Sequence, residues 1–309
     1  MEQVSWGIIG CGDVCERKSA PPLYQLPDSR LVAVMRRDAA AAADFARRHG
    51  VARWYDDLEA FLADPELDTV YVATPDLVHE AGTLAAARAG KHVLVEKAMA
   101  TSAAACQRMI DCCRQHQVSL AVAYYRRCYP SIVRARELLA KGCIGQVQEL
   151  RINDEFPLSH RLDLMHFFCG DLASVRQEQG PVLASDHTGS GPVLVARSQS
   201  GIEARTRLDW DEQLTPEMLQ WTGSDGVLTI TDLKAGHIQW RRDGQTEAED
   251  CGPLPWMHWG LMADMVDHLR RGSPLACDGV EGRKSTVILD LVDDLPADGS
   301  EQAVDYGVS

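Results

Sequence analysis

The first 124 residues alternate short apolar runs with longer segments whose apolar residues recur every three or four positions. Short apolar runs are typical of buried parallel strands, and the spaced segments are typical of the helices that connect them. We expect strands over 4–10, 31–35, 69–74, 92–96 and 119–124. We expect alanine-rich helices over 40–50, 79–90 and 103–116. This alternation predicts a doubly wound α/β domain.

The pattern changes after Pro130. A helix is expected over 131–142, and the runs that follow alternate apolar with polar residues and are separated by glycine-containing turns. These runs predict strands over 147–153, 192–199, 202–210, 217–223, 226–232 and 237–243. Helices over 256–272 and near 280–293 complete this part, and the small polar residues from 296 onward predict an irregular end. We therefore expect two domains, a Rossmann domain over 1–124 and a C-terminal α+β domain over 125–309 with a largely antiparallel sheet.

Composition excludes several classes of protein. The chain of 309 residues is 45% hydrophobic, and none of its apolar runs approaches the roughly 20 residues that cross a bilayer. The net charge of −14, with basic and acidic residues interspersed, disfavours nucleic acid as a partner. The N-terminus has no cationic segment before its apolar residues, so the expected location is cytoplasmic. The ten cysteines are scattered and form no CxxC pair, which predicts reduced thiols and no metal site.

The stretch Gly10-Cys-Gly-Asp-Val-Cys15 nearly satisfies GxGxxG at an expected strand end, with cysteine at the third glycine position. In that pattern the first glycine allows a tight turn, and the second lets the backbone approach a pyrophosphate at a helix N-terminus. The stretch therefore predicts a Rossmann domain that binds a dinucleotide. The predicted contacts are Gly10, Cys11, Gly12, Asp13 and Val14.

The end of the second expected strand indicates which dinucleotide is bound. An acidic residue there would bind the ribose 2′-hydroxyl of NAD, but this strand runs into Arg36 and Arg37. Two guanidinium groups suit a 2′-phosphate, and Asp38 follows one or two residues too late for the ribose. The sequence favours NADP as cofactor, with NAD as the alternative, and leaves open that both arginines are simply solvated.

Several motifs together resemble the glucose-fructose oxidoreductase, inositol dehydrogenase and rhizopine catabolism family, abbreviated Gfo/Idh/MocA. They are GIIGCGDV, the Ala73-Thr-Pro75 segment with His79, AGKHVLVEK, YYRRCYP at 124–130 and ARELLAKGCIGQV. The resemblance implies cofactor contacts from Thr74, Pro75, His79, Glu96, Lys97 and Arg127. It also implies a small-molecule substrate and a homodimer or homotetramer formed through the C-terminal sheet.

Lys97 follows an expected strand, at the edge where open α/β sheets bind ligands. In similar proteins the segment reads Glu-Lys-Pro, and the lysine contacts nicotinamide and substrate and moves a proton. Ala98 replaces the proline here. Because a cis bond before alanine costs about 2.5–4 kcal/mol, we expect a trans bond and a shifted nicotinamide pocket.

A second family signature, D-x-G-x-H-x-x-D, is half present. His160 and Asp163 match its later half, whereas Phe156 and Leu158 stand where the acid and the glycine belong, and the preceding glycine-rich loop is missing. Lys97 or His160 would exchange a proton with the substrate oxygen, and Asp163 would orient His160. The predicted catalytic residues are therefore Lys97, His160 and Asp163. The predicted substrate contacts are Lys97, Tyr124, Tyr125 and His160.

The sequence thus predicts an NAD(P)-dependent dehydrogenase or reductase that acts on CH–OH or C=O groups. Its substrate would be a sugar, a cyclitol or another small carbonyl or hydroxyl compound. Two other functions stay open on the same fold. One is a nucleotide-binding regulator or scaffold that has lost turnover, and the other is an NAD-dependent glycosidase.

Overall fold

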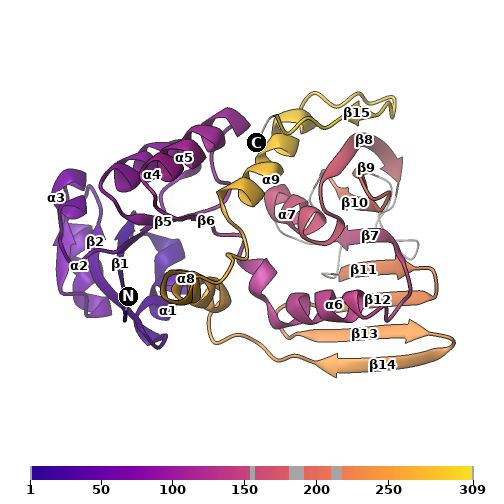
Figure 1. The fold of residues 1–309 in the computed structure, drawn as a ribbon, viewed down its shortest axis with the longest axis horizontal. Coiled ribbons are helices and arrows are strands. Elements are labelled where there is room, and N and C mark those ends of the chain that lie inside the picture. The colour runs from indigo at the N-terminus through magenta and orange to yellow at the C-terminus, as the bar shows by residue number, and fades with distance from the viewer. Residues whose placement is uncertain (1, 154–156, 181–190, 210–217, 308–309) are drawn as a thin grey trace. The chain divides into compact units, whose positions relative to one another are not determined.

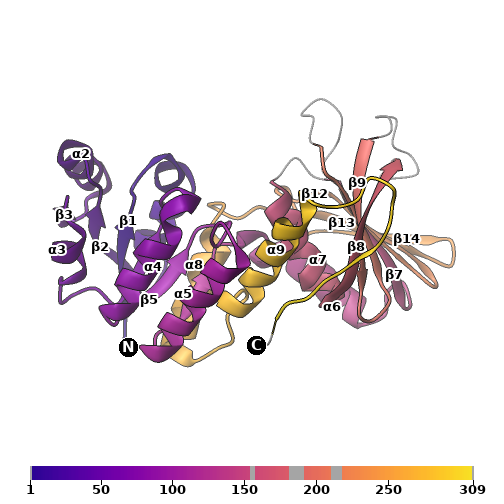
Figure 2. The same ribbon diagram turned by 90° about the horizontal axis from the view of Figure 1, so that it is seen from above.

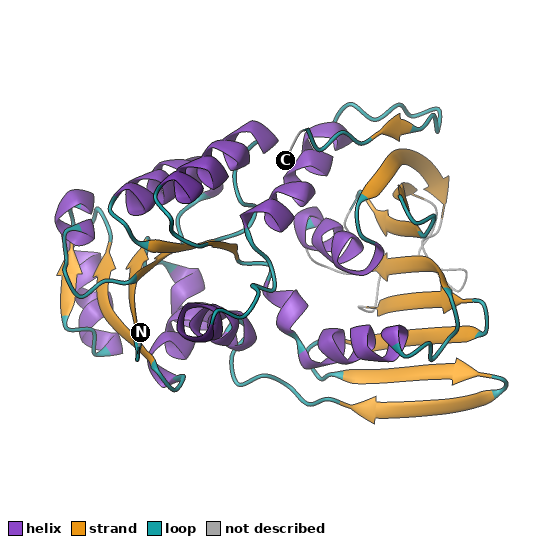
Figure 3. Cartoon of the chain, viewed as in Figure 1, coloured by secondary structure: helices purple, strands orange, loops and turns teal. Residues whose placement is uncertain are grey.

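A computed structural model describes residues 2–153, 157–180, 191–209 and 218–307 (Figure 1). The chain divides into two units. The first comprises Met1–Tyr125 and Pro255–Thr286, and the second comprises Arg126–Leu254 and Val287–Ser309. Each unit has its own sheet, as the strands drawn in Figure 3 show.

The first unit contains a six-stranded sheet whose paired strands are all parallel, in the order β3-β2-β1-β4-β5-β6. The strands are β1 (Val4–Ile9), β2 (Ser29–Met35), β3 (Arg53–Tyr55), β4 (Thr69–Val72), β5 (His92–Val95) and β6 (Leu120–Val122). This order confirms the predicted Rossmann sheet. Strand β3 was not predicted, because three residues are too few to show an alternation.

Helices cover both faces of this sheet. They are α1 (Ala20–Gln25), α2 (Ala39–His49), α3 (Leu58–Leu62), α4 (His79–Arg88), α5 (Ala103–Gln115) and α8 (Trp259–Arg271). Helices α4 and α5 lie on one face, and α1 and α8 lie on the other (Figures 1 and 2). A π-helical turn, η1 (Cys15–Ser19), leads into α1, and a 3-10 turn, η2 (Asp76–Val78), precedes α4.

The segment 255–286 belongs to the first unit, which differs from the predicted single boundary between residues 124 and 125. The Trp256 indole donates a hydrogen bond to Gln25 Oε1 at 2.9 Å, and Arg270 forms an ion pair with Asp28. Farther along, the Val122 amide donates to the carbonyl of Cys277 at 3.0 Å. These contacts attach the returning segment to α1, to the residue before β2 and to β6. Sequence patterns do not show them, because the partners lie more than 150 residues apart.

The second unit contains a nine-stranded sheet in the order β14-β13-β12-β11-β7-β10-β9-β8-β15. Its strands are β7 (Val147–Asn153), β8 (Leu172–Gly180), β9 (Gly191–Ser198), β10 (Glu203–Arg207), β11 (Met218–Gly223), β12 (Gly226–Asp232), β13 (His237–Arg242), β14 (Gln245–Asp250) and β15 (Gln302–Ala303). All pairs are antiparallel except β7 with β10, so the largely antiparallel sheet is confirmed. Strands β8, β14 and β15 were not predicted, and β15 lies in the tail that was expected to be irregular.

Helices α6 (Pro130–Ala140) and α7 (Leu158–Cys169) accompany this sheet, and α7 packs on β7 and β10. The side chains that alternate to the other face of β7, β8 and β10 carry charge. They form the ion pairs Arg151–Glu149 at 2.9 Å, Arg205–Glu203 at 2.9 Å and Arg176–Glu178 at 2.8 Å. The expected oligomer through this sheet stays a prediction, and an interface there would include these charged pairs.

No helix in the described ranges is long and apolar enough to cross a bilayer. Within the same residues, no group of three or more His, Cys, Asp and Glu side chains is placed to hold a metal ion. All ten cysteines are present as thiols.

Helix α9 (Gly279–Val292) provides a test of the packing in the first unit. A Cβ atom at Gly282 would lie 2.8 Å from Val122 Cβ and 2.4 Å from its Cγ2, so it would overlap a buried strand. Glycine to alanine in an exposed helix stabilises by about 1 kcal/mol. Here we expect Gly282→Ala to lower the free energy of unfolding by about 1–3 kcal/mol in urea titrations. Adding Val122→Ala should recover part of that loss, and a stabilising Gly282→Ala would contradict the packing.

Candidate functional site

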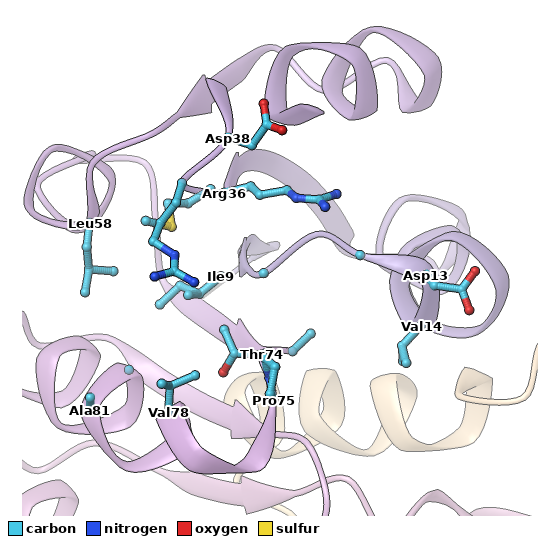
Figure 4. A pocket seen from close by; sticks show the side chains of 16 residues that line it. Ile9, Asp13, Val14, Arg36, Asp38, Leu58, Thr74, Pro75, Val78 and Ala81 are labelled. Atoms are coloured by element: carbon cyan, nitrogen blue, oxygen red, sulfur yellow. The ribbon is translucent and has the colours of Figure 1, made fainter. Parts of the chain in front are cut away.

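A cavity of about 800 Å³ opens at the carboxyl ends of β1, β2 and β4 (Figure 4). This volume lies in the range of small-molecule and cofactor sites. Among the residues predicted to bind cofactor, those that line the cavity are Gly10, Gly12, Asp13, Val14, Arg36, Arg37, Thr74 and Pro75. The sequence motifs therefore converge on one site within the first unit.

Gly10 sets the shape of the turn that follows β1. Its φ of +87° is a conformation that residues with a side chain rarely adopt. A Cβ atom there would lie 2.8 Å from Thr74 Cγ2 and 3.0 Å from the carbonyl oxygen of Ala73. Gly12 donates its amide to the Gly10 carbonyl at 2.8 Å, and nothing lies closer than 3.9 Å to a Cβ atom built on it. The turn thus packs tightly on β4 while its outer side leaves room for a ligand.

Cys15 occupies the third glycine position and is fully buried at the start of η1. Its thiol points to the Gly10 carbonyl at 3.8 Å, and burial raises its pKa to about 12. Cys11 is also buried, and burial raises its pKa to about 11. Both thiols therefore stay protonated at neutral pH, as packing residues do.

Arg36 and Arg37 line the cavity from the loop after β2, and both are exposed. Arg36 extends toward the glycine turn, where its Nη1 lies 3.5 Å from the Cys11 carbonyl oxygen (Figure 4). Neither arginine forms an ion pair with any residue that the structure describes. Asp38 also lines the cavity, but its carboxylate accepts the Ala41 amide at 3.0 Å and caps α2. The side chains that could contact a ligand at the end of β2 are therefore the two cationic arginines.

Asp13 was predicted to contact the cofactor, but its carboxylate is paired with a neighbouring arginine, Arg17. Its carboxylate accepts from Arg17 Nε at 2.9 Å and forms a second, ionic contact with the same guanidinium. Both side chains are more than 70% exposed, so the pair is screened by solvent. Figure 4 shows the carboxylate directed away from Thr74.

An apolar part of the lining was not predicted. It consists of Ile9, Met35, Leu58, Ala73, Val78, Ala81 and Gly82. These residues come from β1, β2, α3 and the segment from β4 to α4, and most are ordinary core residues by sequence. The signal that could have found them is position, since several directly precede or follow a polar residue at a strand end.

Glu96 and Lys97 follow β5 and do not belong to the cavity lining. The buried Glu96 carboxylate accepts from Tyr71 Oη at 2.5 Å and from the Lys97 amide at 3.1 Å. Burial, with the carboxylate beside it, raises the pKa of Tyr71 well above its usual value, so the phenol remains a donor. The carboxylate thereby fixes the backbone of Lys97.

The Lys97–Ala98 peptide bond is cis, so the expected trans bond is wrong. The expectation rested on local conformational energy alone, whereas the Ala98 carbonyl has a tertiary partner, His79, at 2.9 Å. The shifted nicotinamide pocket inferred from a trans bond loses its basis.

His79 is buried at the first residue of α4 and does not line the cavity. Its Nε2 lies 2.7 Å from the Thr74 carbonyl oxygen, and its Nδ1 is the atom that faces Ala98. The histidine therefore contacts the backbone of Thr74, a predicted cofactor contact, and of Ala98, which follows the predicted catalytic Lys97.

His258, to which the sequence assigned no function, lies beside Glu96. Its Nδ1 is 3.8 Å from Glu96 Oε1, and its ring centroid is 4.4 Å from that of Tyr125. Burial lowers the pKa of His258 to about 4, so the ring is neutral at physiological pH. Tyr124 and Tyr125, predicted as substrate contacts, are both buried in this unit.

The remaining predicted residues belong to the second unit. Arg127 and Asp163 form a buried pair, with the guanidinium Nε at 2.9 Å and Nη2 at 2.8 Å from one carboxylate oxygen. The Arg127 guanidinium also lies 5.1 Å from the centroid of the Phe167 ring. His160, in the first turn of α7, is buried and donates its amide to Pro157 at 3.0 Å. Asp163 thus engages an arginine predicted to bind cofactor, and Phe156 lies outside the described residues.

The N-terminal part of the chain is similar in sequence to known oxidoreductases. Residues 4–124 match a family model described as an oxidoreductase family with an NAD-binding Rossmann fold. Oxidoreductase P35 of Formosa agariphila is 41% identical over 145 residues, which cover 47% of this chain and 45% of that protein. Trans-1,2-dihydrobenzene-1,2-diol dehydrogenase of Mus musculus is 34% identical over 157 residues, covering 50% and 47%. The matched part thus spans about half the length of these relatives.

The fold extends beyond the matched residues. The crystal structure of aldose-aldose oxidoreductase from Caulobacter crescentus superposes with a TM-score of 0.84. The match covers 98% of this chain and 100% of that chain at 19% identity. Both units of the chain therefore share the architecture of that protein.

The buried His258 predicts a pH dependence of stability. Its folded pKa of about 4 lies below the ordinary 6.5, so the folded state binds fewer protons in between, and stability falls as pH falls through that window. We expect His258→Phe to remove about 2 kcal/mol of the loss in unfolding free energy between about pH 7.5 and about pH 5. Urea titrations at both pH values measure it. The exposed His116→Phe should leave the pH dependence unchanged, and an equal slope in His258→Phe would refute the assignment.

Proposed function

We propose that this protein is an NADP-preferring dehydrogenase or reductase, since residues 4–124 match the NAD-binding Rossmann fold of the Gfo/Idh/MocA oxidoreductase family. Its proposed substrate is a sugar, a cyclitol or another small hydroxyl or carbonyl compound. One observation carries the choice of cofactor. Arg36 and Arg37 line the cavity at the end of β2, and neither forms an ion pair within the described residues.

The cavity residues suit the parts of a dinucleotide. The turn at Gly10 and Gly12 would hold the pyrophosphate at the start of the helical segment 15–25, where backbone amides and the helix dipole favour an anion. Arg36 and Arg37 would bind a 2′-phosphate through paired, charge-assisted hydrogen bonds. The apolar lining around Leu58 and Val78 would contact the adenine.

A bound nicotinamide cofactor would supply or accept the hydride. Lys97 would give a proton to the substrate oxygen during reduction and take one during oxidation. Glu96 holds the Lys97 backbone through the amide contact of 3.1 Å, which limits where the side chain begins. His160 stays a proposed substrate contact, and Asp163 would fix Arg127 through their buried ion pair.

The substrate class rests on the relatives. Mouse trans-1,2-dihydrobenzene-1,2-diol dehydrogenase acts, by its name, on a cyclic diol, and the Caulobacter protein acts on aldoses. Both names describe adjacent or multiple hydroxyl groups on a ring or chain. A panel of keto-sugars, inososes and small diketones with NADPH therefore covers the proposed class.

If Lys97 is the proton donor, its removal should lower turnover and leave the affinity for NADPH nearly unchanged. We expect Lys97→Ala to lower kcat by about 100-fold or more, since it removes the proton donor. The Kd for NADPH should stay within about threefold of the wild-type value. Loss of NADPH absorbance across the panel measures the first, and fluorescence titration measures the second.

The exposed Lys141→Ala is the matched control for Lys97→Ala and should behave as wild type. Full activity of Lys97→Ala would contradict the proposed role. Silence of the wild type across the panel, with tight NADPH binding, would favour the regulator. A nucleotide that survives purification without exchanging would favour the glycosidase.

The arginines predict the preference for NADP. Arg36→Ala and Arg37→Ala should each weaken NADP⁺ binding by about tenfold or more while changing NAD⁺ binding by less than about threefold. Arg36→Asp should shift the preference toward NAD⁺, because it restores an acid at the ribose position. Calorimetric titration measures all three, with the exposed Arg88→Ala as control. An unchanged ratio of the two affinities in every variant would remove the argument.

A further inference from the structure

His79 contacts two segments of the first unit, the Thr74 segment that lines the cavity and the segment that follows the proposed catalytic Lys97. Thr74, whose carbonyl lies 2.7 Å from Nε2, lines the cavity. Ala98, whose carbonyl lies 2.9 Å from Nδ1, directly follows Lys97. The imidazole is completely buried between them. One side chain therefore bridges the wall of the cavity and the lysine segment.

The chemistry of these contacts is specific. A carbonyl oxygen only accepts hydrogen bonds, so each ring nitrogen must carry a proton for its bond to form. A side chain without donors would leave the carbonyl groups of two half-buried residues to find other partners, which is costly.

The position of the ring is itself fixed. His79 is the first residue of α4, and Gly82 in the next turn packs against β4, where a Cβ atom would lie 3.1 Å from Val72 Cγ1. This close approach sets the distance of α4 from the strand that ends next to Thr74. The helix therefore holds the imidazole as a rigid spacer.

We propose that His79 is a positioning residue that couples the Thr74 wall of the cavity to Lys97, and is not a direct cofactor ligand. This proposal rests on the proposed function for the roles of the cavity and of Lys97. Movement of the Thr74 carbonyl when a dinucleotide binds is passed through the imidazole to the Ala98 carbonyl, and so to the lysine beside it.

His79→Met and His79→Gln form a matched pair for the test. The two side chains have similar length, but glutamine carries an amide nitrogen with two donors and methionine carries none. Two readouts require no turnover. One is the Kd for NADPH by fluorescence, and the other is the rate at which Lys97 reacts with an amine reagent, followed by peptide mass spectrometry.

His92→Met and His92→Gln are the controls. His92 lies in the same unit at the opposite end of β5, where its Nδ1 accepts the Ser119 amide at 3.0 Å. These variants should change neither readout. Thermal unfolding of all four variants shows whether the fold is retained.

We expect His79→Met to weaken NADPH binding by about tenfold and to change the Lys97 reaction rate by about threefold or more. His79→Gln should return both values toward those of the wild type. A change in Kd alone would mean that His79 is a direct ligand, and a lower melting temperature with both readouts unchanged would mean a purely structural role. Either result overturns the coupling.

A wild-type protein that binds neither NADPH nor NADH would refute the proposed function. In that case the Lys97 rates of the Met and Gln variants still decide the link to Ala98. Equal rates in wild type and both variants would refute that link as well.

Discussion

The site depends on the close approach of the Gly10 turn to β4. With φ at +87° and the Ala73 carbonyl 3.0 Å from where a Cβ atom would stand, the chain turns against its neighbouring strand. That contact places the turn, Thr74 and the arginines after β2 around one volume. A side chain at position 10 would force the turn away from β4, and the cavity would lose the wall that gives it depth. The carboxyl ends of the parallel strands form one side of the site, and the close approach at Gly10 leaves a cavity beside them.

Charge is divided within the first unit in a way that suits a phosphorylated dinucleotide. Two exposed arginines stand at the cavity, while the acids near it have other partners, since Asp13 pairs with Arg17 and Asp38 caps α2. The buried carboxylate of Glu96 lies farther along, held by Tyr71 and the Lys97 amide. Cationic groups are thus presented to a ligand, and the anionic groups are satisfied by the protein.

The sequence predicted the fold class well because both units rest on local patterns. Apolar runs and alanine-rich helices indicate the parallel sheet, and alternating runs indicate the antiparallel one. What it missed depends on distant contacts or very short elements. The three residues of β3 show no period, and the return of 255–286 to the first unit depends on pairs such as Trp256 with Gln25.

The same distinction applies to the candidate site. Residues fixed by strand ends, such as Gly10 and Arg36, line the cavity, and their contacts with a cofactor stay a prediction. The conformation of Lys97–Ala98 and the contacts of His79 follow from tertiary hydrogen bonds, which local energies do not show. His258 has no motif around it, and only its burial beside Glu96 distinguishes it. The sequence thus named Glu96 and His79, but not the hydrogen bonds by which they hold the backbone around Lys97.

A crystal structure of the protein with NADP⁺ would test the central claim most directly. We expect the pyrophosphate at the Gly10–Gly12 turn and the 2′-phosphate within hydrogen-bonding distance of Arg36 or Arg37. A dinucleotide bound elsewhere, or a 2′-phosphate directed into solvent with both arginines unengaged, would contradict it.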